Sequence, residues 1–231
     1  MQLPSKRNIR AFLSLAKSSG YSVATRPYEL NIFGVRANKT QPNTFDDQLY
    51  AFYKDDKGAW KGRVYQITTD PGTYWLKNPM QVSGTAILKS GQYKNAYKIG
   101  LHQGKYEALV QSGPVTIIRD YDRNAIADYN NGKESTGTFG INIHRALSSG
   151  TTKNVDKWSA GCQVFANADD YNEFLQMAKK HSGLYGNTFT YTLVDERAYS
   201  RKLKRYGLYI GATILVGVAI FTIYKTLKKK K

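Results

Sequence analysis

The stretch TFGINIH, residues 138–144, alternates apolar side chains with glycine and polar ones. A period of two is typical of a strand that turns one face to a core and the other outward. Phe139, Ile141 and Ile143 would then pack inward. We therefore expect His144 to leave the end of this strand on the face opposite the isoleucines.

Similar short runs recur along most of the chain, separated by turn residues. Tyrosine, which favours strands, is abundant at 18 residues. Turn signals include 70–72 (Asp-Pro-Gly), 113–114 (Gly-Pro) and Gly91. We expect strands at residues 30–35, 48–54, 62–68, 74–76, 84–88, 106–111, 115–119, 139–144 and 188–194.

Two segments, residues 5–18 and 169–180, carry apolar residues at helical spacing. Asn167 stands where an N-cap is needed for the second of them. We expect both helices to pack on a sheet, and we expect His181 to lie in solvent beside the C-terminal dipole of the second. The predicted fold class is mainly β, a β-rich α+β body with few helices.

Cys162 is the only cysteine in 231 residues, which excludes an internal disulfide and a Cys-x-x-Cys zinc site. It is either a small buried hydrophobe or a nucleophile. It ends the run 158–162 (Trp-Ser-Ala-Gly-Cys), whose composition favours a tight loop in which amide N–H groups converge, as an oxyanion site requires. The small polar residues of 146–157 predict a loop that brings Cys162 back toward His144, so that the imidazole can generate the thiolate.

His144, Ser159, Gly161 and Cys162, with 14 residues between the first two, resemble the signature of the L,D-transpeptidase (YkuD-type) catalytic domain family, a histidine followed after a spacer by Ser/Thr-His-Gly-Cys. The resemblance covers about residues 84 to 195. Ala160 replaces the second histidine of the family. Residues 163–164 (Gln-Val) replace its hydrophobic residue followed by Asn or Arg.

The resemblance implies a YkuD-like sheet body and a cysteine acyl-enzyme formed on peptidoglycan stem peptides, without a cofactor. Carried onto this sequence, Cys162 is the nucleophile and His144 the general base. Gly161 and the Cys162 amide are the oxyanion donors, and Ser159 shapes the loop. The altered residues after Cys162 leave both hydrolysis and transpeptidation open.

Three further residues are candidates for substrate binding. His102 lies between glycines in a strand-rich region, where it can line a cleft. Arg119 and Arg145 offer planar forks that suit the carboxylates of a stem peptide, or they form surface ion pairs with acids such as Asp120 and Asp122. No metal site is expected, because the histidines and the cysteine lie too far apart in sequence to form a ligand set.

Residues 206–224 (YGLYIGATILVGVAIFTIY) contain no charge, and as a helix they would span roughly 28 Å. They predict one C-terminal transmembrane helix. Residues 199–205 then form a basic linker and 225–231 a lysine-rich tail, after a catalytic domain of residues 1–198. Lysine and arginine flank both ends of 206–224, so the positive-inside rule does not fix the orientation.

The predicted location is a membrane, spanned once by that helix. Basic residues near the N-terminus have no apolar run behind them, so no secretory signal is expected. The membrane is therefore a viral inner membrane, reached during phage entry or lysis, or the inner membrane of the host. Expected partners are peptidoglycan, the lipid bilayer and other virion or membrane proteins. The net charge of +17 is not accompanied by a nucleic-acid motif.

Two other classes of function remain open at this point. A catalytically inactive, membrane-anchored structural or peptidoglycan-binding virion protein agrees with the altered motif, because folds outlive their chemistry. Retention of both His144 and Cys162 argues against it. A cysteine protease that acts on ordinary proteins would use the same two residues.

Overall fold

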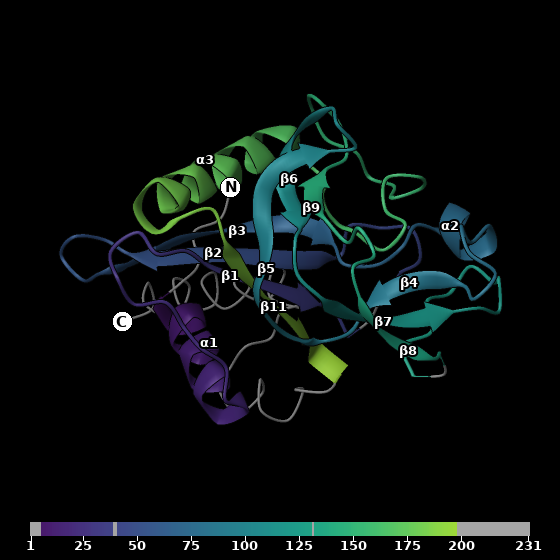
Figure 1. The fold of residues 1–231 in the computed structure, drawn as a ribbon, viewed down its shortest axis with the longest axis horizontal. Coiled ribbons are helices and arrows are strands. Elements are labelled where there is room, and N and C mark those ends of the chain that lie inside the picture. Colours follow the sequence, from purple (N-terminus) through teal and green to yellow (C-terminus); the bar gives the residue numbers. More distant parts are fainter. Residues whose placement is uncertain (1–5, 39–40, 131, 198–231) are drawn as a thin grey trace, which may run out of the picture.

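Eight strands close into a barrel in the order β1-β11-β5-β6-β9-β10-β3-β2. The structure, a computed structural model, describes residues 6–38, 41–130 and 132–197 (Figure 1). The barrel strands are β1 (Asn31–Arg36), β2 (Asp47–Lys54), β3 (Trp60–Thr68), β5 (Gly91–His102), β6 (Tyr106–Gln111), β9 (Ile143–Arg145), β10 (Gln163–Phe165) and β11 (Phe189–Asp195). Most neighbours are antiparallel, but β1 with β11 and β9 with β10 are parallel pairs.

A smaller sheet of three strands, in the order β4-β7-β8, adjoins one end of the barrel (Figure 1). Its strands are β4 (Thr85–Leu88), β7 (Val115–Asp120) and β8 (Glu134–Gly137), all antiparallel to their neighbours. The short helix α2 (Thr73–Lys77) precedes β4 in the chain. Both sheets contribute to one apolar core, since Leu88 and Ile117 belong to the same buried cluster as Leu109 and Leu193.

Two longer helices lie on opposite sides of the barrel (Figure 1). Helix α1 (Lys6–Ser19) packs Phe12 and Leu15 against Phe33 of β1 and Phe52 of β2. Strand β1 is therefore buried on both faces, with Ile32 belonging to the main core and Phe33 to the cluster under α1. Helix α3 (Ala168–Tyr185) adds Phe174 and its apolar neighbours to the main core.

Most of the predicted strands are confirmed within a residue or two, and both predicted helices are present. Asn167 caps α3 as expected, because its side chain accepts a hydrogen bond from the Asp170 N–H at 2.9 Å. The prediction of a strand at 74–76 was wrong, because α2 covers it. Strands β5, β8 and β10 were not predicted.

The fold class inferred from the sequence needs a correction. Its mainly β character agrees with the structure, but it also included a transmembrane helix. None of the helices in the described ranges is long and apolar enough to cross a membrane. The segment that carried the membrane prediction, residues 206–224, lies outside the described residues, as do the predicted linker and tail.

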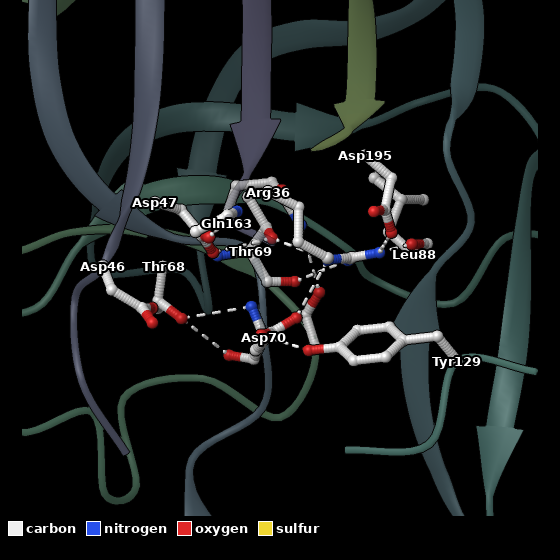
Figure 2. Close-up of polar contacts among 12 residues, drawn as sticks. Arg36, Asp46, Asp47, Thr68, Thr69, Asp70, Leu88, Tyr129, Gln163 and Asp195 are labelled. Carbon is white, nitrogen blue, oxygen red and sulfur yellow. Dashed lines mark hydrogen bonds and ion pairs between the residues drawn. The ribbon is translucent and has the colours of Figure 1, made fainter. Parts of the chain in front are cut away.

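A buried arginine joins the smaller sheet to the barrel. Arg36, at the end of β1, is 1% exposed. It donates hydrogen bonds to Thr69 Oγ1 at 2.9 Å, Thr69 O at 3.1 Å and Leu88 O at 3.0 Å, and it forms an ion pair with Asp70 at 3.0 Å (Figure 2). Since Leu88 ends β4 and Asp70 follows β3, one guanidinium fixes both sheets and the segment between β3 and α2.

Candidate functional site

Cys162 lies immediately before β10 and is half-buried. Its thiol donates to Gly140 O at 3.5 Å, and its sulfur accepts from the Asn142 N–H at 3.4 Å. Burial raises the pKa of the thiol to about 11, opposed only by the Asn142 N–H. The resting group is therefore the thiol rather than the thiolate.

His144 lies on the strand next to Cys162. The parallel register of β9 and β10 pairs His144 with Val164 and Ile143 with Gln163. Ile143 points into the core, as the alternation predicted, so His144 and Asn142 lie on the opposite face. The Gln163 N–H bonds to Asn142 O at 2.8 Å, which places Cys162 beside Asn142. Within the described chain, no hydrogen bond joins the Cys162 sulfur to the His144 ring.

The surroundings of the His144 ring determine which nitrogen carries the proton. Its Nδ1 lies 2.9 Å from Arg145 O, which can only accept a hydrogen bond, so Nδ1 carries the hydrogen. Tyr106 donates its hydroxyl proton to the same carbonyl at 3.0 Å, and its oxygen lies 3.1 Å from Nδ1. The lone pair of His144 therefore resides on Nε2, which is left free to accept a proton.

A second histidine stacks on the first. The rings of His102 and His144 lie 4.0 Å apart between centroids, inclined by 20°. Asn142 donates its amide hydrogen to His102 Nδ1 at 3.0 Å, while its oxygen accepts from the Gln111 N–H at 2.9 Å. His102, a predicted substrate-binding residue, thus lies directly against the predicted base.

Burial and the neighbouring His102 lower the pKa of His144 to about 3. Burial also lowers the pKa of His102, with help from Lys105. Both rings are consequently neutral at physiological pH. A neutral imidazole beside a neutral thiol can act as a base during attack, but it is not a preformed thiolate–imidazolium pair.

The loop before Cys162 is held by contacts that require its particular residues. Ser159 is fully buried; it accepts from the Gly161 N–H at 3.2 Å and donates to Cys162 O at 2.9 Å. Gly161 has a φ of 120°, and a Cβ there would lie 2.2 Å from Ala86 O of β4. The Gly161 amide, predicted as an oxyanion donor, is therefore occupied by Ser159. The Cys162 N–H donates to no acceptor among the residues described.

The two arginines predicted to bind substrate flank this face without carboxylate partners. Arg145 donates to Leu147 O at 2.8 Å and lies 4.4 Å above the Tyr106 ring. Arg119, on β7, donates to Gly84 O at 3.1 Å and lies 5.4 Å from the Phe139 ring. In the described ranges, neither forms an ion pair, so the alternative pairing of Arg119 with Asp120 or Asp122 is not seen. Burial lowers the pKa of Arg119, because charge is costly there without an anion.

Sequence reasoning missed Tyr106 and Asn142. Asn142 carried a usable signal, because it shares a strand face with His144 in the alternating stretch. Tyr106 carried none, since only the pairing of β5 with β6 and of β6 with β9 brings it to the site.

The expectation that His181 is solvated was wrong. It is 6% exposed, accepts from the Leu30 N–H at 3.0 Å through Nδ1, and donates from Nε2 to Thr188 O at 3.1 Å. It lines a polar cavity of about 420 Å³ between the segment before β1 and strands β5 and β11. None of the residues that line this cavity belongs to the cysteine and histidine face.

No ready-made group of three or more His, Cys, Asp or Glu side chains that could hold a metal ion occurs among the described residues. Comparison with known proteins identified no relative: no family model, curated protein or solved structure matches the chain.

Proposed function

We propose that this protein is a cysteine enzyme that cleaves or exchanges peptide bonds in peptidoglycan stem peptides. The observation that carries the proposal is the 2.9 Å contact between His144 Nδ1 and Arg145 O, which assigns the hydrogen to Nδ1. This contact leaves the Nε2 lone pair on the strand face that Cys162 also borders. The resemblance of His144, Ser159, Gly161 and Cys162 to the L,D-transpeptidase signature supports the same chemistry.

The reaction follows from the two neutral groups. His144 Nε2 takes the thiol proton as Sγ bonds to the carbonyl carbon of the substrate, and the carbonyl oxygen becomes an oxyanion. The Cys162 N–H is the available donor for that oxyanion. Collapse of the intermediate breaks the C–N bond, and His144 returns the proton to the departing amine. Water resolves the resulting thioester in hydrolysis, and an amine of a second stem peptide resolves it in transpeptidation.

Arg119 and Arg145 support a substrate that carries carboxylates. Each spends one N–H on a backbone carbonyl and retains others for an anion. Stem peptides carry free carboxylates, and a planar guanidinium binds them through two parallel hydrogen bonds.

A binding protein without catalysis is the second candidate. The specific observation in its favour is the protonated resting thiol, which makes no hydrogen bond to His144 in the described part of the chain. Such a protein would bind peptidoglycan through the same arginines and leave the wall intact.

Digestion of purified peptidoglycan sacculi separates the two candidates. The full chain and its Cys162→Ala variant are incubated with sacculi, and released muropeptides are identified by mass. The proposal expects new products with the wild type alone and equal binding of both proteins to the sacculi. Binding by both without a change in muropeptide composition would reject the enzyme and leave the binding protein.

A further inference from the structure

The connection between β7 and β8 places oxygen-bearing groups at every second position. Asp120 ends β7, and Asp122, Asn124 and Asp128 follow, with Ile126 between the last two. Calcium loops of twelve residues use side-chain oxygens at positions 1, 3, 5 and 9 and a backbone carbonyl at position 7. Counted from Asp120, the four polar residues occupy the side-chain positions and Ile126 the carbonyl position.

A second observation, independent of the spacing, comes from a carboxylate oxygen in this loop. It is buried and has no hydrogen-bond partner within the described chain. Asp120 is 1% exposed. One of its oxygens accepts from the Asp128 N–H at 2.9 Å, which turns the carboxylate toward the loop. The other oxygen is buried and accepts no hydrogen bond within the described chain. An unpaired buried oxygen is costly, so this one calls for a ligand that supplies positive charge.

The electrostatic surroundings point in the same direction. Asp122 and Asp128 bring like charges near the Asp120 carboxylate, and all three are acceptors when ionised. In the described ranges, no lysine or arginine forms an ion pair with Asp120, Asp122 or Asp128. Burial, followed by these like charges, raises the pKa of Asp120 to about 6. A proton or a metal ion relieves the repulsion.

We propose that residues 120–128 form a calcium site with side-chain oxygens of Asp120, Asp122, Asn124 and Asp128 and the carbonyl of Ile126 as ligands. All of these are hard oxygen donors, which calcium prefers. Calcium also accepts several protein ligands in flexible geometry, whereas magnesium demands a near-ideal octahedron and keeps its water. The site does not depend on the proposed chemistry of Cys162.

The loop is not closed around an ion in this structure. Asp122 and Asn124 are exposed, and the Asn124 N–H bonds to Asp122 Oδ1 at 3.1 Å. No three acidic side chains of this described loop already lie close enough together to hold an ion. Calcium binding would therefore turn the Asp122 and Asn124 side chains inward. Ala125 stands at position 6 in place of glycine, and Asn131 stands at position 12 in place of a bidentate glutamate. The affinity therefore belongs with the weak calcium sites, with a Kd of about 10⁻⁴ to 10⁻³ M.

The ion would act on the end of the barrel through Tyr129. This residue follows the loop and donates its hydroxyl proton to Asp70 at 2.5 Å, while its ring lies 4.9 Å from the Arg36 guanidinium (Figure 2). The Arg197 guanidinium lies 3.5 Å from the same ring. Calcium that orders residues 120–128 would therefore hold the Tyr129 ring in place against Arg36. This should raise the thermal stability of the protein.

Terbium luminescence tests the proposal with the full chain, because Tyr121 lies within the loop, Tyr129 follows it, and both can transfer excitation to a bound Tb³⁺. We expect saturable emission that millimolar calcium displaces more effectively than magnesium. Asp122→Asn, an exposed substitution that leaves the core intact, should weaken terbium binding about tenfold, the loss of roughly 1.4 kcal/mol that a charged ligand supplies. Asp169→Asn is the matched control. It removes the charge of one of two neighbouring aspartates, Asp169 and Asp170 of α3, which lie outside the loop. This variant should not change the terbium titration.

Calcium should also raise the melting temperature of the wild type and of Asp169→Asn, and leave that of Asp122→Asn almost unchanged. Absence of saturable emission from the wild type, or equal titrations of Asp122→Asn and the wild type, overturns the proposal.

Discussion

Cys162 and His144 illustrate how burial sets the protonation of the proposed catalytic pair. The sequence suggested an imidazole that holds a thiolate at neutral pH. In the structure both groups are buried enough that their neutral forms are favoured, with a pKa of about 11 for the thiol and about 3 for the imidazole. Under the proposed function, the charge on the thiol and the imidazole would therefore develop only during attack on a substrate, rather than exist beforehand.

This protonation state predicts the reactivity of the free thiol. The rate of Cys162 alkylation by iodoacetamide should rise about tenfold for each pH unit between 7 and 10, because the thiolate fraction follows the raised pKa. Mass spectrometry of the quenched protein measures the rate at the single cysteine. A plateau near neutral pH would instead reveal a preformed ion pair with His144.

Gly161 should tolerate no side chain. Its φ of 120° is strained for any other residue, and a Cβ would lie 2.2 Å from the Ala86 carbonyl oxygen. Gly161→Ala should lower the free energy of unfolding by roughly 1–3 kcal/mol and shift the backbone that positions Cys162. Urea unfolding measures the free energy of unfolding, and the alkylation rate measures the change in reactivity of the Cys162 thiol. Gly104→Ala is a useful control, because it also has a positive φ but no atom within 4 Å of the added carbon. An equal loss in both variants would assign the effect to backbone strain alone.

At the residue scale the sequence indicated His144 and Cys162 because their types and spacing carry the chemistry. It could not indicate how the Gly161 amide is used, since that depends on the rotamer of Ser159. Nor could it place His102 on the His144 ring, because strands β5, β6 and β9 must first pair. The roles of these residues in catalysis remain predictions.

Among the elements, α3 follows local rules most closely. The Asn167 side chain satisfies the Asp170 N–H, and its own amide donates to Thr151 Oγ1 at 2.6 Å. Asn167→Ala should therefore destabilise the protein by about 1 kcal/mol. Asn167→Asp, which keeps the accepting oxygen at the helix N-terminus, should lose much less. Equal urea midpoints for Asn167→Ala and the wild type would contradict a capping contribution.

The elements that escaped prediction have physical reasons in common. Strand β5 begins at Gly91 and contains Gly100, two residues that resemble breaks in a sequence. Strand β10 has three residues and is defined by its partners. Conversely, the strand predicted at 139–144 is reduced to β9, because the Phe139 and Ile141 N–H groups both bond to the Gln111 side chain at 3.0 Å instead of to a strand.

At the scale of the whole molecule, Arg36 connects parts that are distant in sequence. It lies among the carboxylates of Asp70, Asp47 and Asp195, the last at 3.9 Å. Arg36→Met should cost about 3–5 kcal/mol, because the buried acids lose their cation. Lys179→Met, which breaks an exposed ion pair with Glu107, should change the urea midpoint little. Similar losses in the two variants would mean that the buried cation does not hold the molecule together.

No local pattern predicted this network, because a lone arginine at the end of a strand normally reaches solvent. The position becomes interpretable only when Leu88 of one sheet and Asp195 of another converge on the same guanidinium. In this protein, sequence patterns identified most of the segments that form strands, but they did not show which strands pair with one another.

The parallel pairing of β1 with β11 has a consequence for synthesis. Because β11 lies between β1 and β5, the barrel cannot close until the last described strand has left the ribosome. One edge of strand β1 stays unpaired through the translation of all intervening elements, with α1 and β2 as its early neighbours. Such dominance of contacts between distant segments slows folding and leaves nascent chains open to aggregation. This protein should therefore depend on chaperones during translation far more than its compact final core suggests.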